Sequence, residues 1–148
     1  MQLIGSDNTK NNSETNQKVL KEAITIFYPN DKLKKEECLD FMGYAINDYN
    51  MLTLHHITKA ATLRSQGLSD VATIDNCACL GDYSHQALHY IETLDKDLYD
   101  DWNILFLKIN HSRKEFTKEF MDEIVSLQTR SMEVIDNYNM EKSRGIKR

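Results

Sequence analysis

The chain has 148 residues, a net charge of -5 at pH 7 and a pI near 5.5. Its 41% hydrophobic and 28% charged residues are too apolar for a wholly disordered chain and too polar for a membrane span. With 5 Gly and 1 Pro, tight turns are scarce, which disfavours sandwiches, barrels and small disulfide folds. The acidic balance disfavours a general nucleic-acid binder, so we expect no nucleic-acid partner.

The cysteines and the start of the chain bear on its compartment. The three Cys are odd in number and no secretory signal precedes them, so we expect a reduced, cytoplasmic protein. Cys77-x-Cys79 lacks the second ligand pair that is typical of zinc sites, so we expect no metal and no cofactor. No stretch reaches 18 apolar residues, so we expect no membrane span.

The first half of the chain predicts a polar tail and two helices. Residues 1–14 have almost nothing to bury, and we expect a disordered tail there. Helical spacing of apolar residues predicts a helix over about 16–28, which Pro29 stops. The same spacing predicts a second helix over 31–66, with Gly67 as its C-terminal stop.

The second half predicts two more helices, over about 69–109 and 112–140. The near-heptad spacing of apolar residues favours long helices packed side by side, with a break at 110–112. Residues 141–148 form a basic tail that should fray. We therefore predict one all-α domain over 15–140, with long amphipathic helices in an elongated bundle or a coiled-coil-like arrangement.

The apolar stripe around Trp102 is the first candidate site. Large apolar residues surround the helix there, so the segment is either the centre of a bundle or an exposed binding patch. The predicted hydrophobic surface or oligomer contact comprises Leu52, Ala87, Ile91, Leu94, Leu98, Trp102, Leu105, Ile109, Phe116 and Phe120.

The five histidines raise a metal hypothesis. His85-x3-His89 and His111-x3-Glu115 have the four-residue step that can place two ligands on one ion. His85 and His89 lie beside the apolar stripe of their helix, so we interpret them as solvated and predict no metal site. His56 lies on the stripe of the second predicted helix, where it reads as a core residue. Whether His85, His89, His111 and Glu115 bind metal stays open.

Two further features bear on activity and partners. There is no Gly-rich phosphate loop and no local catalytic arrangement, so we predict no catalytic residues and no enzyme. Residues 82–101 hold six acids and one Lys, which is typical of the solvated side of an amphipathic helix. The alternative is an acidic docking face at Asp95, Asp97, Asp100 and Asp101, used by a compact helical-bundle module of the inhibitor or immunity type.

Two stretches resemble the phasins, which coat polyhydroxyalkanoate storage granules in bacteria. The stretch Asn47-Asp48-Tyr49-Asn50-Met51-Leu52-Thr53, followed by Gly67-Leu68, resembles the middle of these proteins. Leu94-x3-Leu98-x-Asp100-Asp101-x3-Leu105, then Lys114-Glu115-Phe116, resembles their later helix. The resemblance covers about 47–127, a little over half the chain.

The phasin resemblance implies a non-enzymatic, acidic, helix-rich protein that forms homo-oligomers. It also implies cytoplasmic granules as the location, with amphipathic helices on the hydrophobic polyester surface. The apolar face of each helix would bind the hydrophobic granule surface, and its charged residues would face water. We expect the residues of the apolar stripe to form that face.

Overall fold

The computed structural model describes residues 7–35, 37–58, 74–113 and 120–143. In chain order the first elements are α1 (Asp7–Phe27), α2 (Lys32–Lys35), β1 (Cys38–Leu39), β2 (Ala45–Ile46) and β3 (Leu52–His56). They are followed by the 3-10 turn η1 (Ile74–Asn76), β4 (Cys77–Gly81), α4 (Asp82–Leu94), α5 (Lys96–Ser112) and α6 (Met121–Ser143).

The all-α prediction is wrong, because two antiparallel strand pairs interrupt the helices. β1 pairs with β2, and β3 pairs with β4 with His55 opposite Ala78. β1, β2 and β3 all lie within the predicted helix over 31–66, and the part of that prediction from 59 onward lies outside the described residues. Among the described residues every strand stands between α2 and α4, so the long helix that the expected coiled-coil arrangement needs there does not form.

Local side-chain chemistry explains why 45–56 is not helical. The Asn47 side chain accepts hydrogen bonds from the N–H groups of Tyr49 and Asn50, at 2.8 and 2.9 Å. Such a turn competes with the helical pattern for the same backbone donors. Beyond it, β3 gains its hydrogen bonds from β4 rather than from its own preceding turn. Helical spacing alone therefore misled the prediction, because tertiary pairing overrides a weak propensity.

The helix boundaries also differ from those predicted. α1 begins at Asp7, inside the predicted disordered tail, and ends at Phe27 before Pro29. The predicted helix over 69–109 is divided into β4, α4 and α5, because Asp95 leaves the helical conformation and its side chain accepts from the N–H of Leu98 as an N-cap. α5 ends at Ser112, in the region predicted for a break. Residues 144–148 of the predicted basic tail lie outside the described residues.

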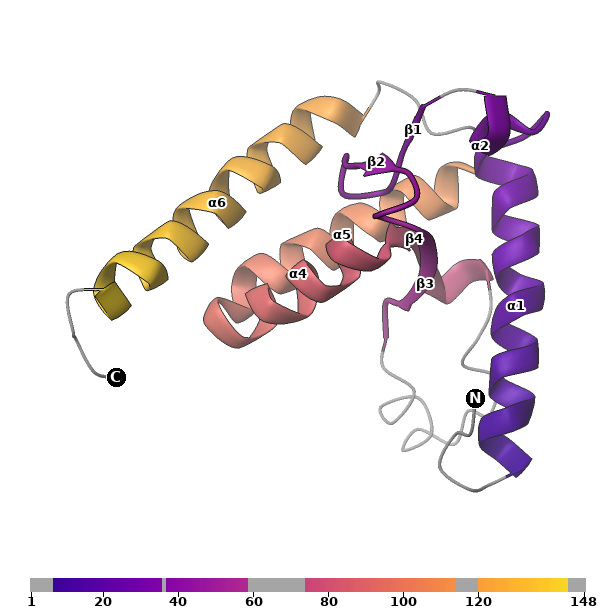
Figure 1. The fold of residues 1–148 in the computed structure, drawn as a ribbon, viewed down its shortest axis with the longest axis horizontal. Coiled ribbons are helices and arrows are strands. Elements are labelled where there is room, and N and C mark those ends of the chain that lie inside the picture. Colours follow the sequence, from indigo (N-terminus) through magenta and orange to yellow (C-terminus); the bar gives the residue numbers. More distant parts are fainter. Residues whose placement is uncertain (1–6, 36, 59–73, 114–119, 144–148) are drawn as a thin grey trace.

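The core forms where the β3–β4 hairpin meets the helices. The hairpin lies between α1 on one side and the antiparallel pair α4 and α5 on the other, while α6 lies on the side of this pair away from α1 and contacts both helices (Figure 1). Trp102 and Phe106 are 0% exposed, and the Trp102 indole N–H donates to Ser131 of α6 at 2.9 Å. The large side chains around α5 are thus buried by several neighbours within this one chain.

The predicted hydrophobic surface falls mostly inside this core. Its buried members are Ile91, Leu98, Trp102, Leu105 and Ile109. Leu52, Ala87, Leu94 and Phe120 are half-buried, and Phe116 lies outside the described residues. Among the described residues these side chains do not form an exposed apolar stripe.

A buried carboxylate anchors the β1–β2 hairpin to β4. Asp40 accepts from the N–H groups of Met42 and Tyr44 through Oδ1, and from Gly81 through Oδ2 at 2.9 Å. Burial raises the pKa of Asp40 above its ordinary value, although these bonds favour the ionised form. Because Gly81 directly precedes α4, this carboxylate also fixes where α4 begins.

Among the described residues no helix combines the length and the apolar character that a membrane-spanning helix needs.

Candidate metal centre

Three histidines converge where β3 meets α4. His55 lies on β3, and His85 and His89 lie one turn apart on α4. One ring nitrogen from each lies within 4.8 Å of the others, and the ring centroids are 5.0 to 5.7 Å apart. His55 is buried, His85 is half-buried and His89 is exposed. The cluster therefore forms a site that reaches from the core to the surface.

The fold brings these residues together through two periodicities. Thr53 and His55 are two positions apart on β3, so their side chains share the strand face that packs against the helices. His85 and His89 are four positions apart on α4, so they lie on one helix face. The short connection at Gly81 then places this helix face against that strand face.

Donor and acceptor roles fix the tautomer of His85. The Thr53 hydroxyl donates its only hydrogen to the carbonyl of Leu80 at 2.8 Å. The same oxygen lies 3.1 Å from Nδ1 of His85, so it accepts a hydrogen from that nitrogen. Nε2 of His85 therefore carries the lone pair that a metal ion would bind.

The same reasoning assigns the other two rings. The Asn103 side-chain N–H₂ donates to the carbonyl of Tyr99, which places the Asn103 side-chain oxygen toward His55. This oxygen accepts a hydrogen bond from Nε2–H of His55 at 2.8 Å, so Nδ1 of His55 carries the lone pair. Nδ1 of His89 lies 3.3 Å from a carboxylate oxygen of Glu92, which can only accept when ionised, so Nε2 holds the lone pair. Each ring is thus held by one nitrogen and offers the other.

The environment keeps the deepest ring uncharged. Burial lowers the pKa of His55 to about 4, and the charges of His85, His89 and His56 act in the same direction. Burial also lowers the pKa of His85, with further contributions from His89 and His56. Neutral imidazole is the form that binds a metal ion, so His55 and His85 are in the ligand state at neutral pH.

This donor set fits a first-row transition metal. Zinc–nitrogen bonds of about 2.0–2.1 Å place tetrahedral ligands about 3.4 Å apart, so small ring movements would close the cluster on one ion. Imidazole favours Zn²⁺, Ni²⁺, Cu²⁺ and Fe²⁺, whereas Mg²⁺ and Ca²⁺ favour oxygen ligands. Three protein ligands leave at least one coordination position for water or substrate, which is typical of catalytic sites. The hydrogen bonds to the outer nitrogens are those that orient metal-bound histidines.

A fourth histidine adjoins the cluster. His56 is the last residue of β3, and its Nε2 lies 3.2 Å from the side-chain oxygen of Asn16 on α1. Burial lowers the pKa of His56. A charge on His56 lowers the pKa values of His55 and His85, so the four rings are electrostatic neighbours.

Asn76 fixes the chain directly after His56. Its side chain accepts from the N–H of Thr58 at 2.8 Å and donates to the carbonyl of Thr58 at 3.0 Å. Its own carbonyl accepts from the N–H of Ile57 at 2.8 Å. The end of β3, with His55 and His56, is therefore held to the start of β4 by one asparagine.

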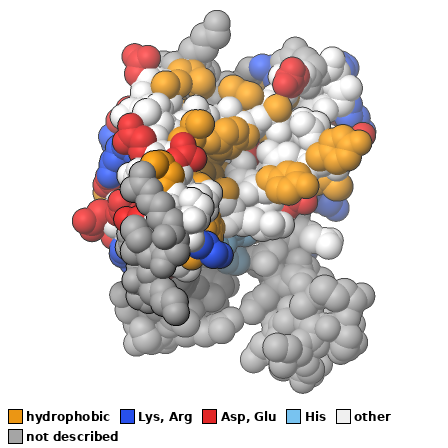
Figure 2. Space-filling model, turned by 60° about the vertical axis from the view of Figure 1, so that its left-hand side comes forward, with side chains coloured by type: hydrophobic (Ala, Val, Ile, Leu, Met, Phe, Trp, Pro, Cys, Tyr) orange, Lys and Arg blue, Asp and Glu red, His pale blue; other side chains and the backbone are white. Residues whose placement is uncertain are grey.

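The other candidate ligands lie elsewhere. His111 is exposed near the end of α5 and is not part of the cluster, and Glu115 lies outside the described residues. Cys77 and Cys79 are buried on β4, where burial raises the pKa of Cys79 and opposes thiolate formation. Histidine atoms also reach the surface on the face drawn in Figure 2, beside a basic side chain.

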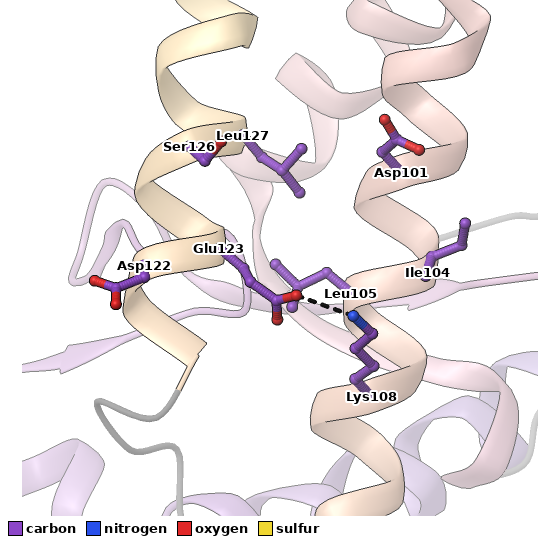
Figure 3. A pocket seen from close by; sticks show the side chains of 8 residues that line it. All are labelled: Asp101, Ile104, Leu105, Lys108, Asp122, Glu123, Ser126 and Leu127. Atoms are coloured by element: carbon purple, nitrogen blue, oxygen red, sulfur yellow. Dashed lines mark hydrogen bonds and ion pairs between the residues drawn. The ribbon is translucent and has the colours of Figure 1, made fainter.

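The predicted acidic docking face is largely engaged within the chain. Asp95 caps α5, Asp100 pairs with Lys96, and Asp101 pairs with Arg130 of α6, while Asp97 is exposed. Asp101 lines a groove of about 410 Å³ between α5 and α6, which the Lys108–Glu123 ion pair bridges (Figure 3). Leu105 and Leu127 point into this groove from opposite helices.

The sequence analysis noted the spacing of His85 and His89 but interpreted both as solvated, and it predicted no metal site. His55, placed within the predicted helix over 31–66, was not connected with them. Alternation along Leu52-Thr53-Leu54-His55 is typical of a strand with Thr53 and His55 on one face. That strand, placed before His85-x3-His89, is the signal that would have indicated a three-histidine site.

The chain was compared with protein-family models, with curated proteins and with solved structures. None of the three comparisons finds a significant match. The evidence for a metal centre is therefore the geometry and chemistry of its own residues.

Proposed function

We propose that this protein is a metal-dependent hydrolase of nucleic-acid phosphodiester bonds. The observation that carries the proposal is the convergence of His55, His85 and His89, each with its tautomer fixed by a hydrogen bond to the outer nitrogen. A purely structural metal site would have a fourth protein ligand. Among the described residues the cluster has three, and it opens to the surface at His89.

A bound ion would polarise a substrate oxygen and lower the pKa of water at the site. The oxygen of the attacking water would form a new P–O bond while the water proton passes to solvent. The bond to the leaving oxygen would break, and that oxygen would take a proton from solvent. His56 is not assigned a role in this step, because it lies on the opposite face of β3 and contacts Asn16 of α1.

Two features favour a phosphodiester over a peptide. Metal peptidases with paired helical histidines carry Glu as the base in the motif H-E-x-x-H, whereas α4 reads His85-Gln86-Ala87-Leu88-His89. Three neutral ligands also leave the full charge of a divalent ion at the site, which suits an anionic substrate. The segment 59–73 after β3 carries Lys59 and Arg64 against one acid, Asp70, although the chain as a whole is acidic.

This proposal differs from the expectations of a non-enzymatic protein without a nucleic-acid partner. The phasin-like coat and the acidic docking module stay predictions that no observation above tests. Burial of Trp102, Leu98 and Ile109 removes the support that an exposed apolar stripe would have given to the coat.

The direct test is cleavage of a single-stranded oligonucleotide and of bis(p-nitrophenyl) phosphate by protein loaded with Zn²⁺, Ni²⁺ or Mn²⁺. We expect turnover of both substrates, its loss with EDTA, and its loss in a His85→Ala variant. His111→Ala, which changes an exposed histidine outside the cluster, is the matched control and should be fully active. Absence of turnover of both substrates with every metal would refute the proposal.

A further inference from the structure

A cleft of about 450 Å³ adjoins the histidine cluster between the end of β3, α4 and α5. Its walls include Asn103, which holds His55, and Glu92, which holds His89. Tyr99, whose ring lies against both histidines, also lines it. The cleft therefore includes the residues that position two of the three rings, those of His55 and His89.

The lining of the cleft combines aliphatic surface with charged groups that disfavour anions. Ile57, Ile104 and Leu107 supply the aliphatic surface. The charged groups of the lining are Glu92, Asp100 and Lys96, and the Lys96 ammonium is paired with Asp100 and lies 5.0 Å from the centre of the Tyr99 ring. Because the cleft carries two carboxylates and one ammonium group that is already paired, a second phosphate group of the substrate is disfavoured in it.

We propose that this cleft is a nucleoside subsite, which receives a base flanking the scissile phosphate of the substrate strand. The inference rests on the proposed function. The volume lies within the range of about 300–1,000 Å³ found for small-molecule sites, and a lining of aliphatic and polar side chains suits a flat, uncharged base. A base inside a duplex is stacked and could not enter, so the inference assigns unpaired strands as the preferred substrate.

Substitution of Ile104 tests the proposed nucleoside subsite most directly. Ile104 is 53% exposed, so Ile104→Glu can be made without disturbing the core. Its side chain lines this cleft and also the groove between α5 and α6 (Figure 3). The added carboxylate would repel the strand and remove apolar contact. Val125→Glu on α6 is the matched control, because Val125 is 49% exposed and does not line the cleft.

The experiment measures binding of a labelled single-stranded hexanucleotide and of the same strand with abasic sites, by fluorescence anisotropy in EDTA. We expect the wild-type protein and Val125→Glu to bind the base-bearing strand about tenfold more tightly, and Ile104→Glu to lose this difference. Equal binding of the two strands by the wild-type protein, or no binding of either, overturns the inference, as does an unchanged preference in Ile104→Glu. A side chain of a protein partner would then be the better candidate for the cleft.

The two proposals fail in different measurements. Hydrolysis of bis(p-nitrophenyl) phosphate depends on the metal centre and needs no nucleoside. If it is absent while the base preference is present, the hydrolase proposal fails and the subsite stands. If it is present while the base preference is absent, only the subsite fails.

Discussion

The Thr53 hydroxyl oxygen and Nδ1 of His85 lie 3.1 Å apart, and this bond joins the start of β3 to the first turn of α4. Because the Thr53 hydrogen is committed to Leu80, the bond has one polarity and fixes the His85 tautomer. A strand residue that binds no metal itself thus decides which nitrogen the helix presents. The candidate centre is built from regular elements, which hold side chains more rigidly than loops do.

Thr53→Val tests this relationship. Valine has nearly the shape of threonine but no acceptor for Nδ1 of His85, so we expect the affinity for Zn²⁺ to fall by roughly 10- to 100-fold. Thr53→Ser restores the hydroxyl and should recover most of the affinity. Metal titration by isothermal calorimetry distinguishes the variants, and equal affinities for Val and Ser would show that the bond has no role.

His56→Asn tests which face of β3 carries the centre. Neighbouring strand residues point to opposite faces, so His56 lies toward Asn16 of α1 and outside the metal cluster. We therefore expect metal affinity and kcat for phosphodiester cleavage both to stay within about twofold of the wild type. Calorimetry and initial-rate measurements on the same preparation test both parts. Loss of metal affinity would assign His56 to the ligand set instead.

The metal-free protein should lose stability as pH falls below 6.5. Unfolded His55 binds a proton near pH 6.5, whereas in the folded protein its pKa is about 4, so the unfolded state binds more protons between these values. The loss amounts to roughly 3 kcal/mol by pH 4, at about 1.4 kcal/mol per pH unit. His56 and His85 act in the same direction, because their pKa values are also lowered.

Urea unfolding in EDTA at a series of pH values measures this loss. Asp40 acts in the opposite sense, because its raised pKa makes the folded state bind more protons above pH 3.8. A His55→Gln variant isolates the histidine contribution, and its stability should depend less on pH than that of the wild type. Parallel curves for the two proteins would contradict the assignment.

Asp40→Asn tests the anchor of the β1–β2 hairpin. The amide keeps the size of the carboxylate but has one acceptor oxygen, so it cannot serve all three N–H groups of Met42, Tyr44 and Gly81. Leaving a buried donor unpaired costs about 1–3 kcal/mol in the free energy of unfolding. Chemical denaturation at pH 7 measures the change, and stability equal to that of the wild type would exclude a structural role for the carboxylate.

Features that depend on local chemistry could be predicted from the sequence. Pro29 marks the end of α1, and α5 ends within the predicted break at 110–112. The step from His85 to His89 also identified two residues of one helix face. These predictions needed only neighbours along the chain.

The remaining features depend on contacts between distant residues. The pairing of His55 with Ala78 joins residues separated by 59–73, and no local pattern encodes that register. Likewise, Asn103 lies 48 positions from His55, and its role follows only from packing of α5 on the hairpin. The apolar residues around Trp102 predicted either burial or a binding patch, and the choice required knowing that α6 covers them.

The most direct test of the central claim is metal titration of metal-free protein, followed through the Co²⁺ absorption spectrum and by calorimetry. We predict that the wild type and His111→Ala bind one equivalent with nitrogen-ligand absorption bands, while His55→Ala, His85→Ala and His89→Ala each lose this tight binding. Circular dichroism checks that the variants are folded. Absence of saturable binding in the wild type, or equal binding by His85→Ala and His111→Ala, would contradict the metal centre.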